Sequence, residues 1–192
     1  MFTFTASLGT IGLVLTFLGR SLVARTPSPN CKARGSHEWL AHRSSPFDSA
    51  TVSIAGRTAK ICYSRPSAHG RLVFGSTVPY GKLWRTGANE PTVLHLPFAA
   101  EVAGVRLQPG RYLLLTVPRP ESWIIAFYTA NSDDSGEMFR TMSQVGQGVA
   151  STEPLENPIE TFTIRGTDGS DRAELLLEWQ HVRVRIPVRL IS

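Results

Sequence analysis

The chain has 192 residues, of which 42% are hydrophobic and 18% charged, and its formal net charge is +5. This length suits one domain plus a targeting segment better than two domains, and the composition is ordinary for a globular protein with a packed core. No Lys/Arg-rich run with interleaved aromatic residues is present, so nucleic-acid binding is not expected.

The charges are unevenly spread along the chain. Residues 32–85 contain nine Lys/Arg and two Asp/Glu, a net +7, whereas residues 86–192 contain nine and thirteen, a net −4. The first half could therefore meet a small anionic ligand or an acidic partner. Alternatively, the two halves pair with each other in the fold.

The N-terminal segment has the features of an export or anchoring sequence. Residues 1–19 carry no charged side chain, and residues 11–18 are strongly apolar. Residues 1–25 are therefore predicted to be a signal peptide or a membrane anchor. We expect the protein to be exported, periplasmic or extracellular, or else membrane-anchored through this segment if it is not cleaved. Residues 26–43 are rich in Pro, Ser, Arg and Lys without apolar periodicity, which predicts a flexible linker.

Cys31 and Cys62 are the only two cysteines. In an exported chain they could form a disulfide that ties the linker to a strand. Two unpaired cysteines are the slightly favoured alternative.

From residue 44 onward the pattern changes to short apolar runs separated by Gly and Pro. Residues 55–57 and 166–169 favour hairpins, Gly104 and residues 108–110 have turn chemistry, and one short helix is expected near residues 137–144. We therefore predict an all-β fold: residues 44–192 form a single β-sandwich or barrel-like domain of short antiparallel strands.

The C-terminal strand has the clearest register. Across residues 182–190, apolar residues alternate with Arg and Pro, so one face is buried and the other faces solvent. A two-residue turn at residues 180–181 would place Glu178 opposite Arg183. Pro187 indicates that this strand lies at an edge of the sheet.

The stretch 63–92 contrasts with the strands because it is aperiodic and rich in Gly and Arg. Its Arg side chains suit a carboxylate or a phosphate, and its aromatic residues could wall a pocket. The candidate ligand-binding residues are Arg71, Tyr80, Trp84, Arg85, Asn89 and Glu90. No metal or cofactor is expected. His37 and His42 resemble a zinc-protease pair but would lie about 140° apart on a helix.

Three functions remain open for this stretch, besides the possibility that its polar residues only stabilise the loop. The first is binding of a small anionic ligand. The second is hydrolysis, with Glu90 as base, Arg85 as oxyanion stabiliser and Tyr63 or Ser64 nearby. The third is a structural or interaction module of the cell envelope. In all cases the side chains of four residues are predicted to converge within hydrogen-bonding reach, directly or through one water: Arg71, Arg85, Asn89 and Glu90.

These motifs resemble the domain of unknown function 2911 family, and the resemblance spans nearly everything from Ser45 to Ile191. The matching segments are Tyr63-Ser64-Arg65-Pro66, Gly70-Arg71, Phe74-Gly75, Pro79-Tyr80-Gly81-Lys82-Leu83-Trp84-Arg85-Thr86-Gly87-Ala88-Asn89-Glu90-Pro91-Thr92 and Gly110-Arg111-Tyr112-Leu113-Leu114. The resemblance implies an exported bacterial β-rich domain and leaves its activity open. Phe47 stands where this family usually has His, so any role of that His is absent here. Residues 128–149 also lack the family's Trp-Gly-x-Tyr-like stretch.

Overall fold

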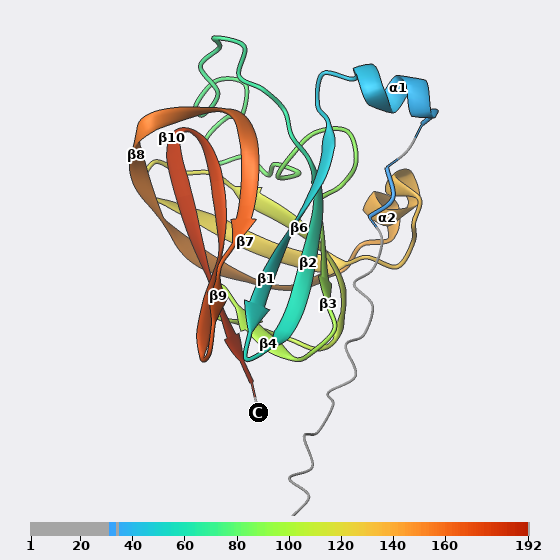
Figure 1. Cartoon of the computed structure of the whole chain (residues 1–192), viewed down its shortest axis with the longest axis vertical. Helices are drawn as coiled ribbons and strands as arrows, with labels where there is room; N and C mark the ends of the chain where they lie inside the picture. Colours follow the sequence, from blue (N-terminus) through green and yellow to red (C-terminus); the bar gives the residue numbers. More distant parts are fainter. Residues whose placement is uncertain (1–30, 34, 192) are drawn as a thin grey trace, which may run out of the picture.

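The computed structural model of the protein describes residues 31–33 and 35–191 (Figure 1). The predicted signal peptide or anchor lies outside the described residues. None of the helices in the described ranges is long and apolar enough to cross a membrane. The elements are β1 Phe47–Ile54, β2 Arg57–Ser64, β3 Val93–Leu96, β4 Ala100–Val102, β5 Val105–Leu107, β6 Gly110–Val117, β7 Ser122–Thr129, β8 Gln144–Gly166, β9 Asp168–Gly169, β10 Arg172–Leu190, α1 His37–His42 and α2 Ser135–Thr141.

Local turn chemistry explains the short hairpins. β1 and β2 are joined by Ala55 and Gly56, whose φ angles are 48° and 74°, and β4 and β5 by Ala103 and Gly104, at 53° and 80°. Two consecutive positive φ angles define the turn whose twist matches antiparallel strands. The hairpin at residues 55–57 and the turn at Gly104 were predicted from the sequence, and both are confirmed.

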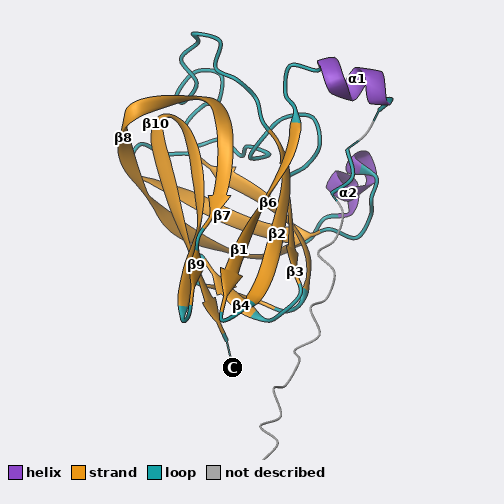
Figure 2. Cartoon of the chain, viewed as in Figure 1, coloured by secondary structure: helices purple, strands orange, loops and turns teal. Residues whose placement is uncertain are grey.

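The strands form one mostly antiparallel sheet in the order β5-β4-β10-β8-β7-β6-β3-β2-β1-β9 (Figure 2). β9 belongs to the connection between β8 and β10, yet it pairs in parallel with β1. The tip of the β8–β10 hairpin therefore returns to the far edge of the sheet. Gly166 permits this approach, since a Cβ there would lie 2.0 Å from the carbonyl oxygen of Thr51. The all-β prediction is confirmed, in the form of a single curled sheet that is not closed.

The two longest strands bend over one end of the sheet. The first half of β10 pairs with the second half of β8, and beyond Gln180 the pairing shifts in register, so that Val182 lies opposite Pro154. The predicted turn at residues 180–181 is wrong. Gln180 has a φ of 49° but produces an irregularity inside one continuous strand. Glu178 and Arg183 meet nevertheless, because the bend brings them together.

β10 is an interior strand, so the edge predicted from Pro187 is also wrong. β10 lies between β8 and β4. Pro187 occurs where the strand changes partners, after Arg185 pairs with β8 and before Val188 pairs with β4. Its missing N–H is therefore tolerated there. The predicted alternation of buried and solvent-facing residues is confirmed along this strand.

The N-terminal part of the described chain is attached to the sheet. Cys31 forms a disulfide with Cys62 of β2, so the favoured expectation of unpaired cysteines was wrong. Residues 26–43 were predicted to be a flexible linker, but α1 lies within them, capped by Ser36. α2 overlaps the predicted helix and buries Met138 against the outer face of the sheet.

Candidate functional site

The candidate site lies on the long connection between β2 and β3, residues 65–92, which we call the crossover loop. Figure 1 shows it arching over one end of the sheet. The loop inserts Phe74 and Trp84 among the core aromatic residues. Trp84 stacks on Trp179 at a centroid distance of 6.0 Å and meets Trp123 edge-on at 5.9 Å. Trp84 was predicted to line a pocket, but it packs against the core of the sheet.

The loop is anchored to the bend of β8 and β10. Gln180 Oε1 accepts from the backbone N–H of Val73 at 3.0 Å, and Gln180 Nε2 donates to the carbonyl oxygen of Arg71 at 2.9 Å. The backbone N–H of His69 donates to Glu160 Oε1 at 2.6 Å. The irregularity at Gln180 thus positions a side chain that holds the loop in place.

The end of the loop has an unusual backbone. The φ angles of Thr86 and Asn89 are 59° and 54°, a conformation that a β-branched residue such as Thr rarely adopts. Gly87 has no room for a side chain, because a Cβ would lie 2.9 Å from the carbonyl oxygen of Ser64. Thr92 Oγ1 donates to the carbonyl oxygen of Thr86 at 2.7 Å. Buried hydrogen bonds of this kind hold the strained turn.

Glu90 is the buried acid of the loop, with 7% of its surface exposed. Its Oε1 accepts from Arg43 Nη1 at 2.7 Å, and its Oε2 accepts from Ser64 Oγ at 2.5 Å. Ser64 is fully buried. The carboxylate is therefore paired inside the fold, as expected of a residue that stabilises the loop.

Arg43 was missed by the sequence interpretation. Its side chain is 3% exposed, and its guanidinium carbon lies 5.3 Å from the ring centre of Trp39 and 5.7 Å from that of Phe47. Arg43 lies 47 residues before Glu90 in a stretch without apolar periodicity. Its proximity to Ser45-Pro46-Phe47, where the family resemblance begins, was the only available signal.

Direct contacts do not join the four side chains that were predicted to converge. Arg85 Nη1 donates to the carbonyl oxygen of Asn89 at 3.2 Å, and Asn89 Nδ2 donates to that of Ser45 at 3.3 Å. Arg71 bonds instead to the carbonyl oxygens of residues 67 and 68. Among the described residues, no hydrogen bond or ion pair links Arg71 or Arg85 to Glu90. Tyr80 is 42% exposed and packs over Gly75.

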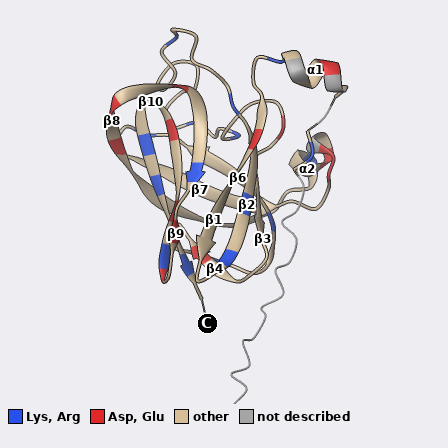
Figure 3. Cartoon of the chain, in the orientation of Figure 1, with Lys and Arg blue, Asp and Glu red and all other residues tan. Residues whose placement is uncertain are grey.

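The two oppositely charged halves of the chain pair only in part. Arg43 pairs with Glu90, and Lys32 pairs with Asp133 at 3.1 Å. Lys32 and Arg111 also lower the pKa of the Asp133 carboxyl through hydrogen bonds. Figure 3 shows further basic positions on the loops at the crossover-loop end. Three cations of the loop form no ion pair with a carboxylate within the described ranges. They are Arg71, Lys82 and Arg85.

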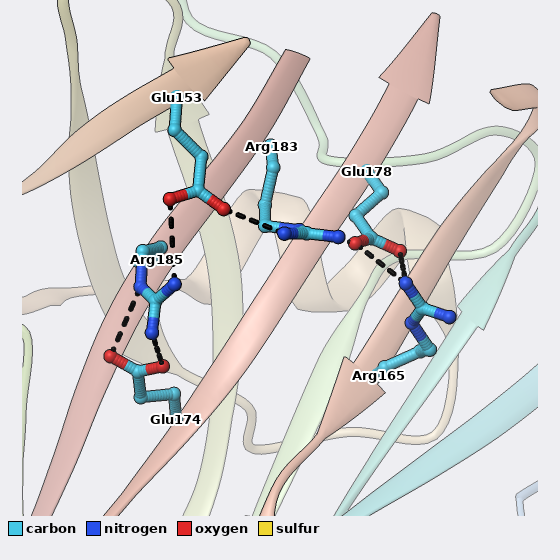
Figure 4. Close-up of polar contacts among 6 residues, drawn as sticks. All are labelled: Glu153, Arg165, Glu174, Glu178, Arg183 and Arg185. Carbon is cyan, nitrogen blue, oxygen red and sulfur yellow. Dashed lines mark hydrogen bonds and ion pairs between the residues drawn. The ribbon is translucent and has the colours of Figure 1, made fainter. Parts of the chain in front are cut away.

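A second charged network lies across β8 and β10 (Figure 4). The Glu178 carboxylate is fully buried, with Arg183 Nε 2.5 Å from Oε1 and Arg165 Nη2 2.5 Å from Oε2. The chain of contacts continues from Arg183 to Glu153 and then through Arg185 to Glu174. The hydrogen bond from Arg183 lowers the pKa of Glu153. This network joins the two arms of the bent β10, which indicates a structural role.

The remaining titratable candidates also lie in structural positions. Tyr63 is buried, its hydroxyl accepts from the backbone N–H of Ile164 at 2.9 Å, and burial raises its pKa. His95 is a residue of β3, and burial lowers its pKa. Across the described parts of the chain, no group of three His, Cys, Asp or Glu side chains could hold a metal ion.

Comparison with known proteins identifies the family. A family model described as "Protein of unknown function (DUF2911)" matches residues 45–188, which include β1 to β9, the crossover loop and most of β10. Neither the search of curated proteins nor the search of solved structures found a match. Since the family model covers about three quarters of the sequence, the chain belongs to the DUF2911 family.

Proposed function

We propose that the domain is a non-catalytic binding module that binds an acidic partner through the exposed side chains of the crossover loop. These residues are Arg71, Leu72, Tyr80, Lys82, Leu83 and Arg85. The observation that carries the proposal is their combination of exposed apolar groups with cations that have no carboxylate partner among the described residues. Leu72 is 69% exposed, Leu83 53% and Tyr80 42%.

The apolar exposure is concentrated in this loop. Of the six large hydrophobic side chains that are exposed in the described chain, three lie between residues 72 and 83. Single exposed apolar residues need no explanation, but their grouping with cations that lack a carboxylate partner among the described residues is typical of a surface that binds a partner. The loop is also firmly anchored at its ends, which lowers the entropy cost of binding.

Charge complementarity specifies the partner. Cations without a carboxylate nearby favour an anionic group, and Arg71 and Arg85 can each present a planar fork to a carboxylate. The protein's net charge of +5 adds a long-range attraction for acidic molecules. An acidic polypeptide with some apolar side chains satisfies both features of the loop.

The hydrolytic alternative has less support. A general base needs an open position and access to substrate, whereas Glu90 is buried and bound by Arg43 and Ser64. The envelope-module alternative rested on the N-terminal tether together with an edge strand at residues 182–190, and it loses the second support because β10 is an interior strand.

Binding of fluorescein-labelled poly-L-glutamate, measured by anisotropy, tests the proposal. We expect Lys82→Glu and Arg71→Glu each to weaken binding by about tenfold, because each reverses a charge at the contact. Arg57→Glu is the matched control, since Arg57 lies at the β1–β2 turn, at the end of β2 opposite the crossover loop. Absence of binding, or an equal loss with Arg57→Glu, would show that the loop does not form a specific site.

A further inference from the structure

The most buried ion pair at the crossover-loop end joins two different parts of the protein. The acid, Glu90, belongs to the loop, whereas the cation, Arg43, belongs to the segment that precedes β1. We call residues 31–33 and 35–45 the strap. The side chains of Arg43 and Glu90 are only 3% and 8% exposed. The strap thus places one guanidinium deep in a site that the rest of the domain builds.

The walls of this site have the chemistry that recognises a guanidinium. Glu90 supplies a buried carboxylate, and the hydroxyl oxygen of Ser64 accepts from Arg43 Nη2 at 3.3 Å. The Phe47 ring offers an aromatic face to the cation. A carboxylate, a hydroxyl acceptor and a ring face together favour a planar, delocalised cation over an ammonium. Glu90, Ser64 and Phe47 all lie outside the strap, so the site does not depend on the strap for its walls.

Arg43 fills the site imperfectly. Its Nε is buried and has no hydrogen-bond partner among the described residues. A buried N–H group without an acceptor makes the binding of the side chain in its site less favourable. Trp39, which faces the guanidinium from α1, is 49% exposed. The strap is held non-covalently by the pair of Arg43 with Glu90 and by Asn89 Nδ2, which donates to the carbonyl oxygen of Ser45.

A covalent bond adds to these contacts. The Cys31–Cys62 disulfide fixes the start of the strap to β2. A further contact there, Lys32 with Asp133, is largely exposed and contributes little. While the disulfide is intact, the effective concentration of Arg43 at the site is high, and an external cation competes poorly.

We propose that Glu90, Ser64 and Phe47 form a guanidinium-binding site that Arg43 occupies in cis, and that the Cys31–Cys62 disulfide keeps it occupied. Reduction lowers the effective concentration of Arg43 at the site, so a guanidinium group from another molecule then competes with Arg43 and replaces it. A dithiol supplies the two electrons and two protons: the S–S bond becomes two thiols, and the dithiol becomes a cyclic disulfide. This site takes a cation, so it is separate from the proposed anion-binding residues of the crossover loop.

Chemical rescue tests the site. Arg43→Ala removes the occupant, and millimolar propylguanidinium should raise the Tm of this variant by roughly 3 °C through selective binding to the folded state. Propylurea has a similar planar shape without the charge and should have no effect. The double variant Arg43→Ala/Glu90→Gln should not respond to either compound. Equal shifts with propylurea, or an undiminished response in the double variant, would overturn the site.

The unmodified protein supplies a second test, which also applies if Arg43→Ala does not fold. Propylguanidinium should raise the Tm of the dithiothreitol-reduced protein but leave that of the oxidised protein unchanged. A matched measurement on Cys31→Ser should reproduce the reduced state without reductant. If the oxidised and reduced proteins respond equally, the disulfide does not control the site. If neither the reduced protein nor Arg43→Ala responds, there is no guanidinium site.

Discussion

Loss of the Cys31–Cys62 disulfide should lower the free energy of unfolding by a calculable amount. The bond closes a loop with a sequence separation of 31 residues, which includes α1, β1 and most of β2. In the chain-entropy treatment, a loop of this length restricts the unfolded chain by about 12 cal/mol/K, or about 3.7 kcal/mol at 25 °C. Cys31→Ser should therefore lose about this much stability.

Equilibrium urea unfolding measures the effect. Two independent routes, Cys31→Ser and reduction of the unmodified protein with dithiothreitol, should give the same decrease in the free energy of unfolding. Agreement excludes an artefact of the serine or of the reductant. A loss below about 1 kcal/mol by both routes would refute the reasoning, since it would mean that the closed loop does not restrict the unfolded chain as assumed.

Three further changes test the structural interpretation. Glu178→Gln should lower the free energy of unfolding in urea by about 1–3 kcal/mol, because the fully buried partner of two Arg side chains loses its charge. Glu174→Gln, at a more exposed position, should lower it by less than about 1 kcal/mol. Gly166→Ala should cost at least about 3 kcal/mol by forcing the β8–β10 hairpin away from Thr51, compared with about 1 kcal/mol for Gly104→Ala, where a Cβ meets nothing within 4 Å. Burial and the nearby cations Arg111 and Lys60 lower the pKa of His95 below its usual 6.5, so the unfolded state binds its proton more readily and stability should fall as the pH drops through 6.5. His95→Gln should flatten this part of the stability–pH curve, and an unchanged slope would contradict the assignment.

The sequence predicted those parts of the fold that local chemistry determines. The hairpin at Ala55-Gly56 and the turn at Gly104 were predicted because short turns are signalled by adjacent residues. The alternation along residues 182–190 correctly identified the buried face of β10. The turn predicted at 180–181 failed because the register of β10 depends on β8, whose pairing residues are distant in sequence.

The candidate site was harder to predict for the same reason. The crossover loop was recognised as unusual from its composition, but the partner of Glu90 could not be identified. Arg43 comes from a stretch that reads as a linker, and the contact depends on the three-dimensional position of the strap. Trp84 was misassigned because an aromatic residue in a Gly-rich loop can wall a pocket or enter the core, and sequence does not distinguish the two.

The central claim is that Glu90 stabilises the loop while the exposed loop residues bind the partner. Measuring both urea unfolding and poly-L-glutamate affinity for Glu90→Gln and Lys82→Glu tests it most directly. Glu90→Gln should lose about 3 kcal/mol of stability, because it breaks a buried ion pair, and should keep the affinity of its folded form within about twofold. Lys82→Glu should change stability by less than about 0.5 kcal/mol and weaken binding about tenfold. The opposite pattern, with Glu90→Gln stable but unable to bind, would contradict the account.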